Sequence, residues 1–459
     1  MKQTNKILSL LLAVMMIFSL AACSSGKTDA PSVTTAPATE STGAQAAATE
    51  GETHEPVTLT IVHEHSEEAA ANIVTSAAFR YCMDKYKQDH PWVTLEETIV
   101  ANSEIGNKYL TMIAADDLPD ICYVKYTWLE STAGNGMLVD LTEYADPSKY
   151  YDGLASTTYE GKVYGLENKY TMYNLICYNT KLWKDAGLEL PKTFEDLVAA
   201  DAVFDAMGID TISLGNTAKW FAVSYFTDSL YYNVCGEDWT SKAIQGDKSI
   251  NWTDPKSVEA LTKLQSMKDI FNADFNMTDD VAAASAYMQG KAACHVIGSW
   301  GIPTLEGLSK DYPEVWENTR VAILPTANNS EEYLINASGA AVGVSSRLQE
   351  PGKEAELQAA IEFVQYISSD YYAQYCAEHG STTPVKTTFD WSNKPQPYVD
   401  LADILANAKH TGLNFNDYIT ESVKTVIQNE TQSLLAGATT PEAAAANIQA
   451  VQEQVWNQQ

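Results

Sequence analysis

The chain has few basic residues and lacks the common catalytic signatures. It carries 29 lysines and arginines against 60 aspartates and glutamates, a formal net charge of −31. This excess of negative charge would repel nucleic-acid phosphates, so we expect no nucleic-acid partner. No HExxH, GxSxG, P-loop, CxxC or GxGxxG pattern is present. We therefore expect no metal, nucleotide or other cofactor, and no enzyme of the classes that these motifs define.

Long hydrophobic runs are also scarce. One apolar run extends from Ile7 to Leu20, behind Lys2 and Lys6, and no later run approaches the roughly 20 residues that a membrane-spanning helix needs. A positive start, an apolar centre and small residues at its end are typical of a secretory signal. After its removal at residue 22, 27 basic and all 60 acidic residues remain, for a formal charge of −33.

A single cysteine follows the apolar run. The order Leu20-Ala21-Ala22-Cys23 resembles the bacterial lipobox, which implies cleavage before Cys23 and attachment of lipid to its sulfur. The alternative is a secreted protein that is cut near Ala22. In the lipoprotein interpretation, residues 1–22 are a signal peptide. Residues 23–56, which are rich in Ser, Thr, Ala and Gly, are the lipid anchor and a flexible linker.

The remaining cysteines are few and scattered. No two of them have the spacing of a metal site or a redox pair, and each stands among apolar or aromatic residues. We expect most of them to be buried free thiols, although disulfides are permitted outside the cell. They stand at positions 82, 122, 177, 235, 294 and 376.

The body of about 400 residues is too long for one compact core, which indicates two domains. Strand patterns at 57–62, 92–100 and 120–124 alternate with helix patterns at 67–88 and 107–115, which predicts a parallel α/β sheet. Further helices are expected at about 193–207, 255–271 and 353–378 and in the C-terminal tail.

Several stretches together resemble one protein family. Their order and spacing are similar to the landmarks of the extracellular solute-binding proteins (family 1 type) that serve bacterial ABC sugar importers. The stretches are LPDICYVKYTWLESTAGNGMLVDLTEY, YEGKVYGLENKYTMYNLICYNTKLWKDAGLELPKTFEDL, MQGKAACHVIGSW and ASGAAVGVS.

The resemblance implies an α/β, periplasmic-binding-protein-like fold of type II. Two lobes would enclose a ligand cleft and be joined by hinge crossings near residues 170–174 and 336–339. The N-terminal lobe would comprise residues 57–170 plus 338–384, and the C-terminal lobe residues 171–337 plus 385–459.

The function that the resemblance implies is solute capture rather than catalysis. A monomeric lipoprotein on the extracytoplasmic face of the cell membrane, held there by its lipid anchor alone, would bind a mono- or oligosaccharide and deliver it to ABC permease subunits. The alternatives are a peptide, a polyamine or an organic anion as the solute. A secreted glycoside hydrolase is a further alternative, because it needs only two suitably spaced carboxylates.

Ligands of open α/β sheets bind beyond the carboxyl ends of strands, so the residues after each strand are site candidates. His63, Glu64 and His65 follow the first strand. They could be structural loop residues, or two ligands of an incomplete metal site. They could also bind solute hydroxyls, for which Glu64 is the best candidate and His63 another.

Two aromatic residues and a lysine follow the strand that ends at Val124. Lys125, Tyr126 and Trp128 could line a sugar site, since flat rings cover the apolar face of a pyranose while polar groups take its hydroxyl rim. One of the two aromatic residues could equally belong to the core.

The second lobe offers further aromatic candidates. Trp220 and Tyr225 are as compatible with the core as with a ligand contact. Trp300 is the strongest candidate, because the apolar strand 292–297 and the turn at Gly298-Ser299 would present its indole at a strand end. The resemblance places a sugar-stacking aromatic residue at this point, and burial in the second lobe is the alternative.

Overall fold

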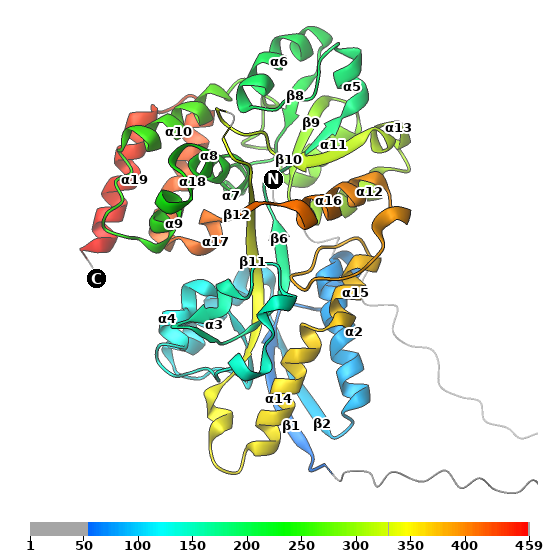
Figure 1. The fold of residues 1–459 in the computed structure, drawn as a ribbon, viewed down its shortest axis with the longest axis vertical. Helices are drawn as coiled ribbons and strands as arrows, with labels where there is room; N and C mark the ends of the chain where they lie inside the picture. The colour runs from blue at the N-terminus through cyan, green and yellow to red at the C-terminus, as the bar shows by residue number, and fades with distance from the viewer. Residues whose placement is uncertain (1–53, 329, 458–459) are drawn as a thin grey trace, which may run out of the picture. The chain divides into compact units, whose positions relative to one another are not determined.

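The computed structural model describes residues 54–328 and 330–457 (Figure 1). The predicted signal peptide, the predicted lipidation site Cys23 and nearly all of the predicted linker lie outside these residues. No helix in the described residues is long and apolar enough to cross a bilayer.

The first sheet has the strand order β12-β11-β3-β1-β2, and β6 also pairs with β11. β1 is parallel to β2 and β3, as the strand and helix patterns predict, whereas β11 is antiparallel to β3. The strands are β1 (Val57–His63), β2 (Val93–Ile99), β3 (Ile121–Val124), β6 (Leu166–Met172), β11 (Tyr333–Val344) and β12 (His410–Leu413).

The helix expected over 67–88 is interrupted at Ile73. Ser66 caps α1 (Glu67–Asn72), and the chain is extended at Ile73 before α2 (Val74–Asp89) begins. Ile73 opens a run of three β-branched residues, whose restricted side chains disfavour a continuous helix at this point. α3 (Asn102–Ala114) begins earlier than expected.

A second interruption divides the helix expected over 353–378. α14 (Glu354–Ile367) ends at Ser368, and Ser369 adopts the extended backbone of an N-cap before α15 (Asp370–Glu378). α14 and α15 both pack on α2 and help to enclose the core of the first sheet.

The second sheet has the order β10-β7-β9-β8. β8 and β9 are parallel, and β7 is antiparallel to both β9 and β10. Every residue of β7 and β9 is buried, as expected for central strands. The strands are β7 (Leu175–Asn179), β8 (Asp210–Ser213), β9 (Ala292–Ile297) and β10 (Thr319–Ile323), and a separate hairpin is formed by β4 (Thr158–Tyr159) and β5 (Lys162–Val163).

Helices near the second sheet follow local capping signals. A capping box between Thr193 and Asp196 starts α6 (Phe194–Met207), close to the expected 193–207. The other helices near the second sheet are α5 (Thr180–Asp185), α11 (Asp280–Met288), α12 (Ile302–Leu308), α13 (Pro313–Glu317) and α16 (Gln396–Asn407), whereas α4 (Leu129–Thr132) packs in the core of the first sheet.

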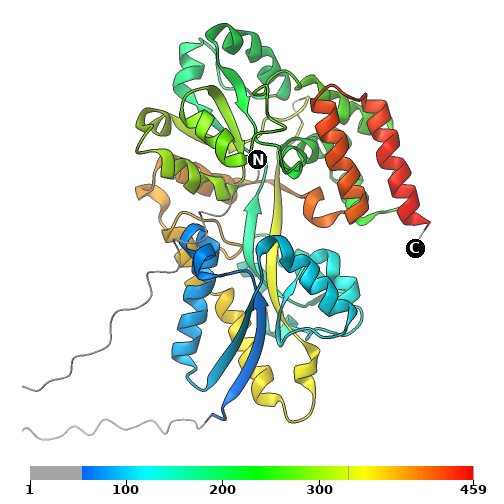
Figure 2. The same ribbon diagram turned by 180° about the vertical axis from the view of Figure 1, so that it is seen from behind.

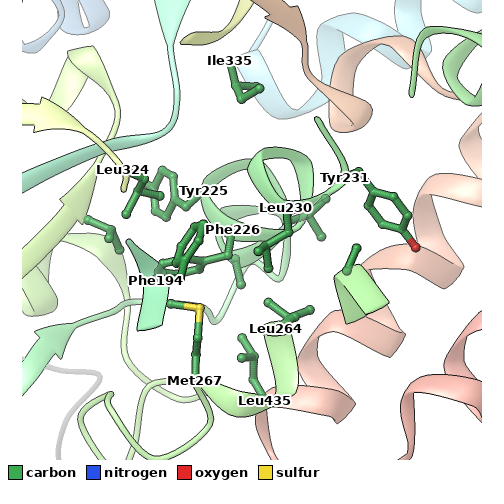
Figure 3. Packing of buried hydrophobic residues seen from close by; sticks show 14 of the residues in the cluster. Phe194, Tyr225, Phe226, Leu230, Tyr231, Leu264, Met267, Leu324, Ile335 and Leu435 are labelled. Carbon is green, nitrogen blue, oxygen red and sulfur yellow. The ribbon is translucent and has the colours of Figure 1, made fainter. Parts of the chain in front are cut away.

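A helical layer packs beside the second sheet, and Figure 2 shows α18 and α19 side by side within it. Its core converges between α8, α10 and α18, where Phe226, Leu230, Leu264, Met267 and Leu435 point toward one another (Figure 3). α10 ends at Ser266, before the expected residue 271. The layer contains α7 (Trp220–Ala222), a π-helix (Val223–Thr227), α8 (Asp228–Cys235), α9 (Glu237–Gln245), α10 (Pro255–Ser266), α17 (Phe415–Tyr418), α18 (Glu421–Leu435) and α19 (Pro441–Trp456).

β6 and β11, two strands of the first sheet, run side by side along the middle of the described body (Figure 1). Asn336 pairs with Met172 and Ser338 with Tyr170, so the two predicted crossing segments are neighbours in one ladder. The Asn174 side chain adds a brace, since its Nδ2 donates to Tyr333 O (2.9 Å) and its Oδ1 accepts from Ile335 N (2.8 Å).

The six cysteines of the described residues are all free, which confirms the prediction for most of them. Five are buried and Cys235 is half-buried. Burial raises the pKa of the Cys82 and Cys235 thiols to about 12, which keeps them in the unreactive thiol form at neutral pH.

Candidate ligand-binding site

Trp300 is presented where β9 ends. The chain leaves the buried strand through Gly298 and enters a 3-10 turn, η6 (Ser299–Gly301), in which Trp300 is 37% exposed while its two neighbours are buried. A Cβ atom on Gly298 would lie 1.7 Å from Cζ3 of Trp300. The indole therefore folds back over a position that only glycine can occupy.

Four aromatic side chains surround this indole. The ring centre of Trp300 lies 5.5 Å from Tyr173, 5.7 Å from Trp220 and 6.5 Å from both Phe221 and Tyr225. We call these five residues the aromatic cluster. They come from the segment after β6, from the start of the helical layer and from the end of β9, so the tertiary fold brings them together.

The backbone that presents Trp220 is irregular. Lys219 has φ 60° and ψ −37°, and the Trp220 N–H donates to Ala218 O at 2.7 Å, which closes a γ-turn. The π-helix Val223–Thr227 follows almost at once. Strained residues and π-helical turns occur often at functional sites, so this segment agrees with a binding role for the residues it carries.

Two carboxylates adjoin the aromatic cluster. The Tyr173 hydroxyl donates to Oδ2 of Asp417 at 2.7 Å, on the short helix α17 that Asn414 caps. Asp280, the first residue of α11, faces the Trp300 indole, and burial raises its pKa to about 6. Carboxylates beside flat aromatic rings can accept hydrogen bonds from the hydroxyl rim of a sugar.

The residues after β3 reach toward the same region. Tyr126, in the turn η1 (Tyr126–Trp128), lies with its ring centre 5.1 Å from that of Tyr418 on α17. Lys125 places its Nζ 5.2 Å from the ring centre of Trp128, which is buried. Of Lys125, Tyr126 and Trp128, it is Tyr126 that contacts α17, the helix that carries Asp417.

The end of β1 has a different character. The His63 side chain is fully buried, and its Nδ1 accepts the His65 N–H at 3.1 Å. Its Nε2 must then carry the proton that it donates to Glu97, at 3.2 Å. Burial lowers the pKa of His63, which keeps the ring neutral. Both ring nitrogens are thus engaged within the first lobe, and a ligand role for His63 remains a prediction that this geometry does not support.

The neighbours of His63 are also held internally. His65 is buried, with Nδ1 2.9 Å from the Ser76 hydroxyl and Nε2 2.9 Å from the Tyr123 hydroxyl. Glu64 is half-buried, and its backbone hydrogen-bonds to Tyr123. Its role in binding solute hydroxyls stays a prediction. The described residues contain no group of three or more His, Cys, Asp or Glu that could hold a metal ion.

The structure thus brings Trp220, Tyr225 and Trp300 into one cluster, and each of these was a candidate from sequence. Tyr225 is fully buried and supports the ring of Trp300 from within. Sequence reasoning missed the other members of the site. They are Tyr173, Phe221, Asp280, Asp417 and Tyr418.

For one of the missed residues, the sequence does contain a pattern that indicates a binding role. Tyr173 follows directly on β6, and the rule that pointed to the other strand ends applies to it as well. Asp417 and Tyr418 lie in a short helix far along the chain, and no local pattern connects them to the strand ends.

Two surface hollows lie elsewhere. One of about 500 Å³ is formed by the loop around Met277 and the end of α18 near Gly437, and one of about 510 Å³ lies between α3 and α4 near Leu110. Neither is lined by the aromatic cluster.

Comparisons with known proteins identify the family. The model of the bacterial extracellular solute-binding protein family matches residues 70–374, which is more than half of the chain. A maltodextrin-binding protein of Bacillus subtilis is 27% identical over 60% of this chain. A diacetylchitobiose-binding protein of Streptomyces coelicolor is 24% identical over 61% of it. The alignments span 62% and 64% of those two relatives.

The fold is shared with solved structures. A chitin oligosaccharide binding protein superposes with a TM-score of 0.73 at 23% identity, over 86% of this chain and 98% of that protein. This likeness confirms the two-lobed α/β fold of periplasmic binding proteins that the sequence resemblance implies. The matched family consists of binding proteins rather than enzymes, and the chain is a member of the bacterial extracellular solute-binding protein family.

Proposed function

We propose that this protein captures a mono- or oligosaccharide and delivers it to the permease of an ABC importer. The observation that carries the proposal is the part-exposed indole of Trp300, backed by four aromatic rings and flanked by Asp280 and Asp417. A flat ring covers the C–H face of a pyranose, and carboxylates accept its hydroxyl protons. The maltodextrin, diacetylchitobiose and chitin oligosaccharide in the relatives' names support the same class of solute.

Trp300 and Trp220 supply the stacking surface in this proposal, with Tyr225 beneath them. Tyr126 and Lys125 approach from the first lobe, while Trp128 stacks on Tyr109 with ring centres 5.6 Å apart and supports them. The Tyr126–Tyr418 contact joins η1, which follows β3, to α17 of the helical layer, so a solute held near it would touch both of these elements.

The lobes would close on the solute by bending at the paired crossing segments. In this proposal they comprise residues 57–170 with 338–384, and 171–337 with 385–459. A solute that contacts both lobes favours the closed form, since the contacts of one lobe are gained only on closure. Small-angle X-ray scattering should show a smaller radius of gyration at saturating sugar, and an unchanged radius would count against a hinge.

A lipid anchor at Cys23 would hold the protein on the extracytoplasmic face of the membrane, near the permease. Each buried acyl methylene contributes about 0.8 kcal/mol, so two or three chains give durable attachment. Metabolic labelling with a fatty-acid probe tests the anchor. Label should appear on the wild type and be absent from Cys23→Ala, and equal labelling of both would refute it.

A thermal-shift panel on the unlipidated body tests the class of solute. Maltotriose, diacetylchitobiose, xylobiose and raffinose represent sugars, and spermidine, citrate and a tetrapeptide represent the alternatives. A compound that binds the folded state alone raises the melting temperature with its concentration. At least one sugar should shift the wild type and fail to shift Trp300→Ala. A shift with the non-sugar compounds alone would overturn the carbohydrate proposal.

A further inference from the structure

The turn that presents Trp300 is tied to β6 by a side chain. Ser299, the residue before Trp300, is buried, and its Oγ accepts the Met172 N–H at 3.3 Å. Met172 is the last residue of β6 and directly precedes Tyr173. The ring centres of Tyr173 and Trp300 lie 5.5 Å apart. One hydrogen bond therefore joins the two backbone positions next to which these neighbouring rings project.

A third segment completes this attachment. Thr382, in the chain between α15 and α16, is also buried, and its hydroxyl donates to Tyr170 O at 2.9 Å. The same hydroxyl lies 3.2 Å from Ser299 Oγ, which is a second acceptor for its proton. The side-chain hydroxyls of Ser299 and Thr382, which we call the hydroxyl link, thus hold three segments of the chain together.

The outer edge of β6 needs these partners. β11 pairs with the other edge, where the Tyr173 N–H donates to Ile335 O at 2.9 Å. Backbone groups of successive strand residues point to opposite edges, so the Met172 N–H and the Tyr170 carbonyl face away from β11. Both residues are buried, and an unpaired buried backbone group is costly. The hydroxyl link supplies the partners that solvent water cannot.

The hydroxyl link lies where the proposed lobe boundaries meet. Tyr170 is the last residue of the first stretch of the proposed N-terminal lobe, and Ser338, which pairs with it in the ladder, begins the second stretch. Thr382 stands shortly before the end of that second stretch. Through the hydroxyl link, the turn that carries Trp300 is therefore held against the crossing segments as well as by its own strand β9.

We propose that Ser299 and Thr382 are positioning residues, which fasten the turn of Trp300 to the crossing segments and so hold the indole in place for the solute. The effect on affinity rests on the sugar function proposed above, whereas the position of the indole is a property of the protein alone. Ring contacts are weakly directional compared with hydrogen bonds, and the Trp300 plane makes angles as different as 66° and 20° with Tyr173 and Tyr225.

Variants that remove one hydroxyl test the proposal. Thr382→Val keeps the shape of the side chain, and Ser299→Ala removes the other hydroxyl. Thr382→Ser keeps the hydroxyl and is the rescue variant. Thr157→Val is the matched control in the first lobe, because the buried Thr157 hydroxyl likewise donates to a backbone carbonyl, that of Gly165, at 2.8 Å. It measures the general effect of losing such a hydroxyl.

Nuclear magnetic resonance of the ¹⁵N-labelled body observes the indole without any sugar. The chain has ten tryptophans, and Trp300→Phe identifies the indole signal of interest. This signal should shift or broaden in Ser299→Ala and in Thr382→Val, because the turn loses its attachment to β6. Thr382→Val is the decisive variant, since Thr382 is not adjacent to Trp300 in the chain. The signal should keep its wild-type position in Thr382→Ser and in Thr157→Val.

Sugar binding is the second readout, measured by calorimetry with whichever panel sugar raises the melting temperature of the wild type most. Ser299→Ala and Thr382→Val should each weaken binding about fivefold, whereas Thr382→Ser and Thr157→Val should bind as the wild type does. The double variant of Ser299→Ala and Thr382→Val should be weakened by less than the product of the two single effects, because both residues act through one link.

The outcomes separate the two proposals. A Trp300 indole signal that is unmoved in Thr382→Val, or that moves as far in Thr157→Val, overturns the positioning role. A moved signal with unchanged affinity also overturns it, because the position of the indole would then not matter to the solute. If no panel compound binds the wild type, the sugar proposal fails, while the indole signals still decide whether the hydroxyl link holds Trp300.

Discussion

The ends of β1 and β9 look alike in sequence and differ in the structure. Each strand is buried at its carboxyl end and offers large side chains there that could serve a ligand. At the end of β1, the His63 and His65 side chains turn inward, where their ring nitrogens are engaged by Glu97, the His65 N–H, Ser76 and Tyr123. After β9, Trp300 remains 37% exposed on a support of other rings. Residue type at a strand end therefore does not decide whether a side chain faces solvent, because the partners available nearby decide it.

The largest expected effect concerns Trp300 at the end of β9. Trp300→Ala should weaken sugar binding by about 3 kcal/mol, since it removes the central stacking surface. The unfolding free energy should fall by less than the roughly 3 to 5 kcal/mol expected for a fully buried tryptophan, because Trp300 is 37% exposed. Calorimetry and the apo melting temperature give the two quantities. A large fall in melting temperature with near-native affinity would show that Trp300 is a core residue.

A pH titration tests the buried histidines, with His295 of β9 as the clearest case. Burial lowers its pKa to about 4, whereas the unfolded chain has a value near 6.5. The unfolded state therefore binds more protons between these values, and about 3 kcal/mol of stability is lost as pH falls from 6.5 to 4.

Urea unfolding at a series of pH values, on the wild type and on His295→Asn, measures that loss. Over this range the unfolding free energy of the variant should depend less steeply on pH, because one proton fewer is taken up on unfolding. Equal slopes would mean that His295 is not buried in its neutral form. Asp280 changes the unfolding free energy in the opposite direction. Because its pKa is raised in the folded state, its contribution to stability falls as pH rises toward 6.

His63→Ala tests the end of β1, where the histidine side chains are buried. We expect a loss of about 2 kcal/mol in unfolding free energy, because Glu97 loses a donor and a buried site is left unfilled. Sugar affinity should be unchanged, the reverse of the result for Trp300→Ala. A selective loss of affinity would instead restore His63 as a ligand residue.

The smallest effect concerns Lys219, whose strained backbone precedes Trp220. Lys219→Gly should raise the unfolding free energy by about 0.5 kcal/mol, since relief of strain at φ 60° and ψ −37° slightly exceeds the added chain entropy. Lys219→Ala is the matched control. It loses the same exposed contact with Asn429 and keeps the strain. A melting temperature that falls in the glycine variant as much as in the control would contradict the strain.

Much of the fold was predictable because its signals are local. Alternating apolar residues placed β1 and β2 closely, a continuous apolar run placed β9, and the helix expected at about 193–207 agrees with α6. The errors were also local in origin. Ile73 and Ser369 interrupt helices that periodicity alone would continue, and each interruption spans only one or two residues.

The sequence by itself determined the family, the parallel start of the first sheet and the turn that presents Trp300, since these depend on residues close together in the chain. Tertiary structure decided which candidates meet. Tyr173 and Asp417 are 244 residues apart, and His63 is 34 residues from the Glu97 that engages it. Burial and hydrogen-bond partners are properties of such distant pairs, and they arise only when the sheets and helices pack.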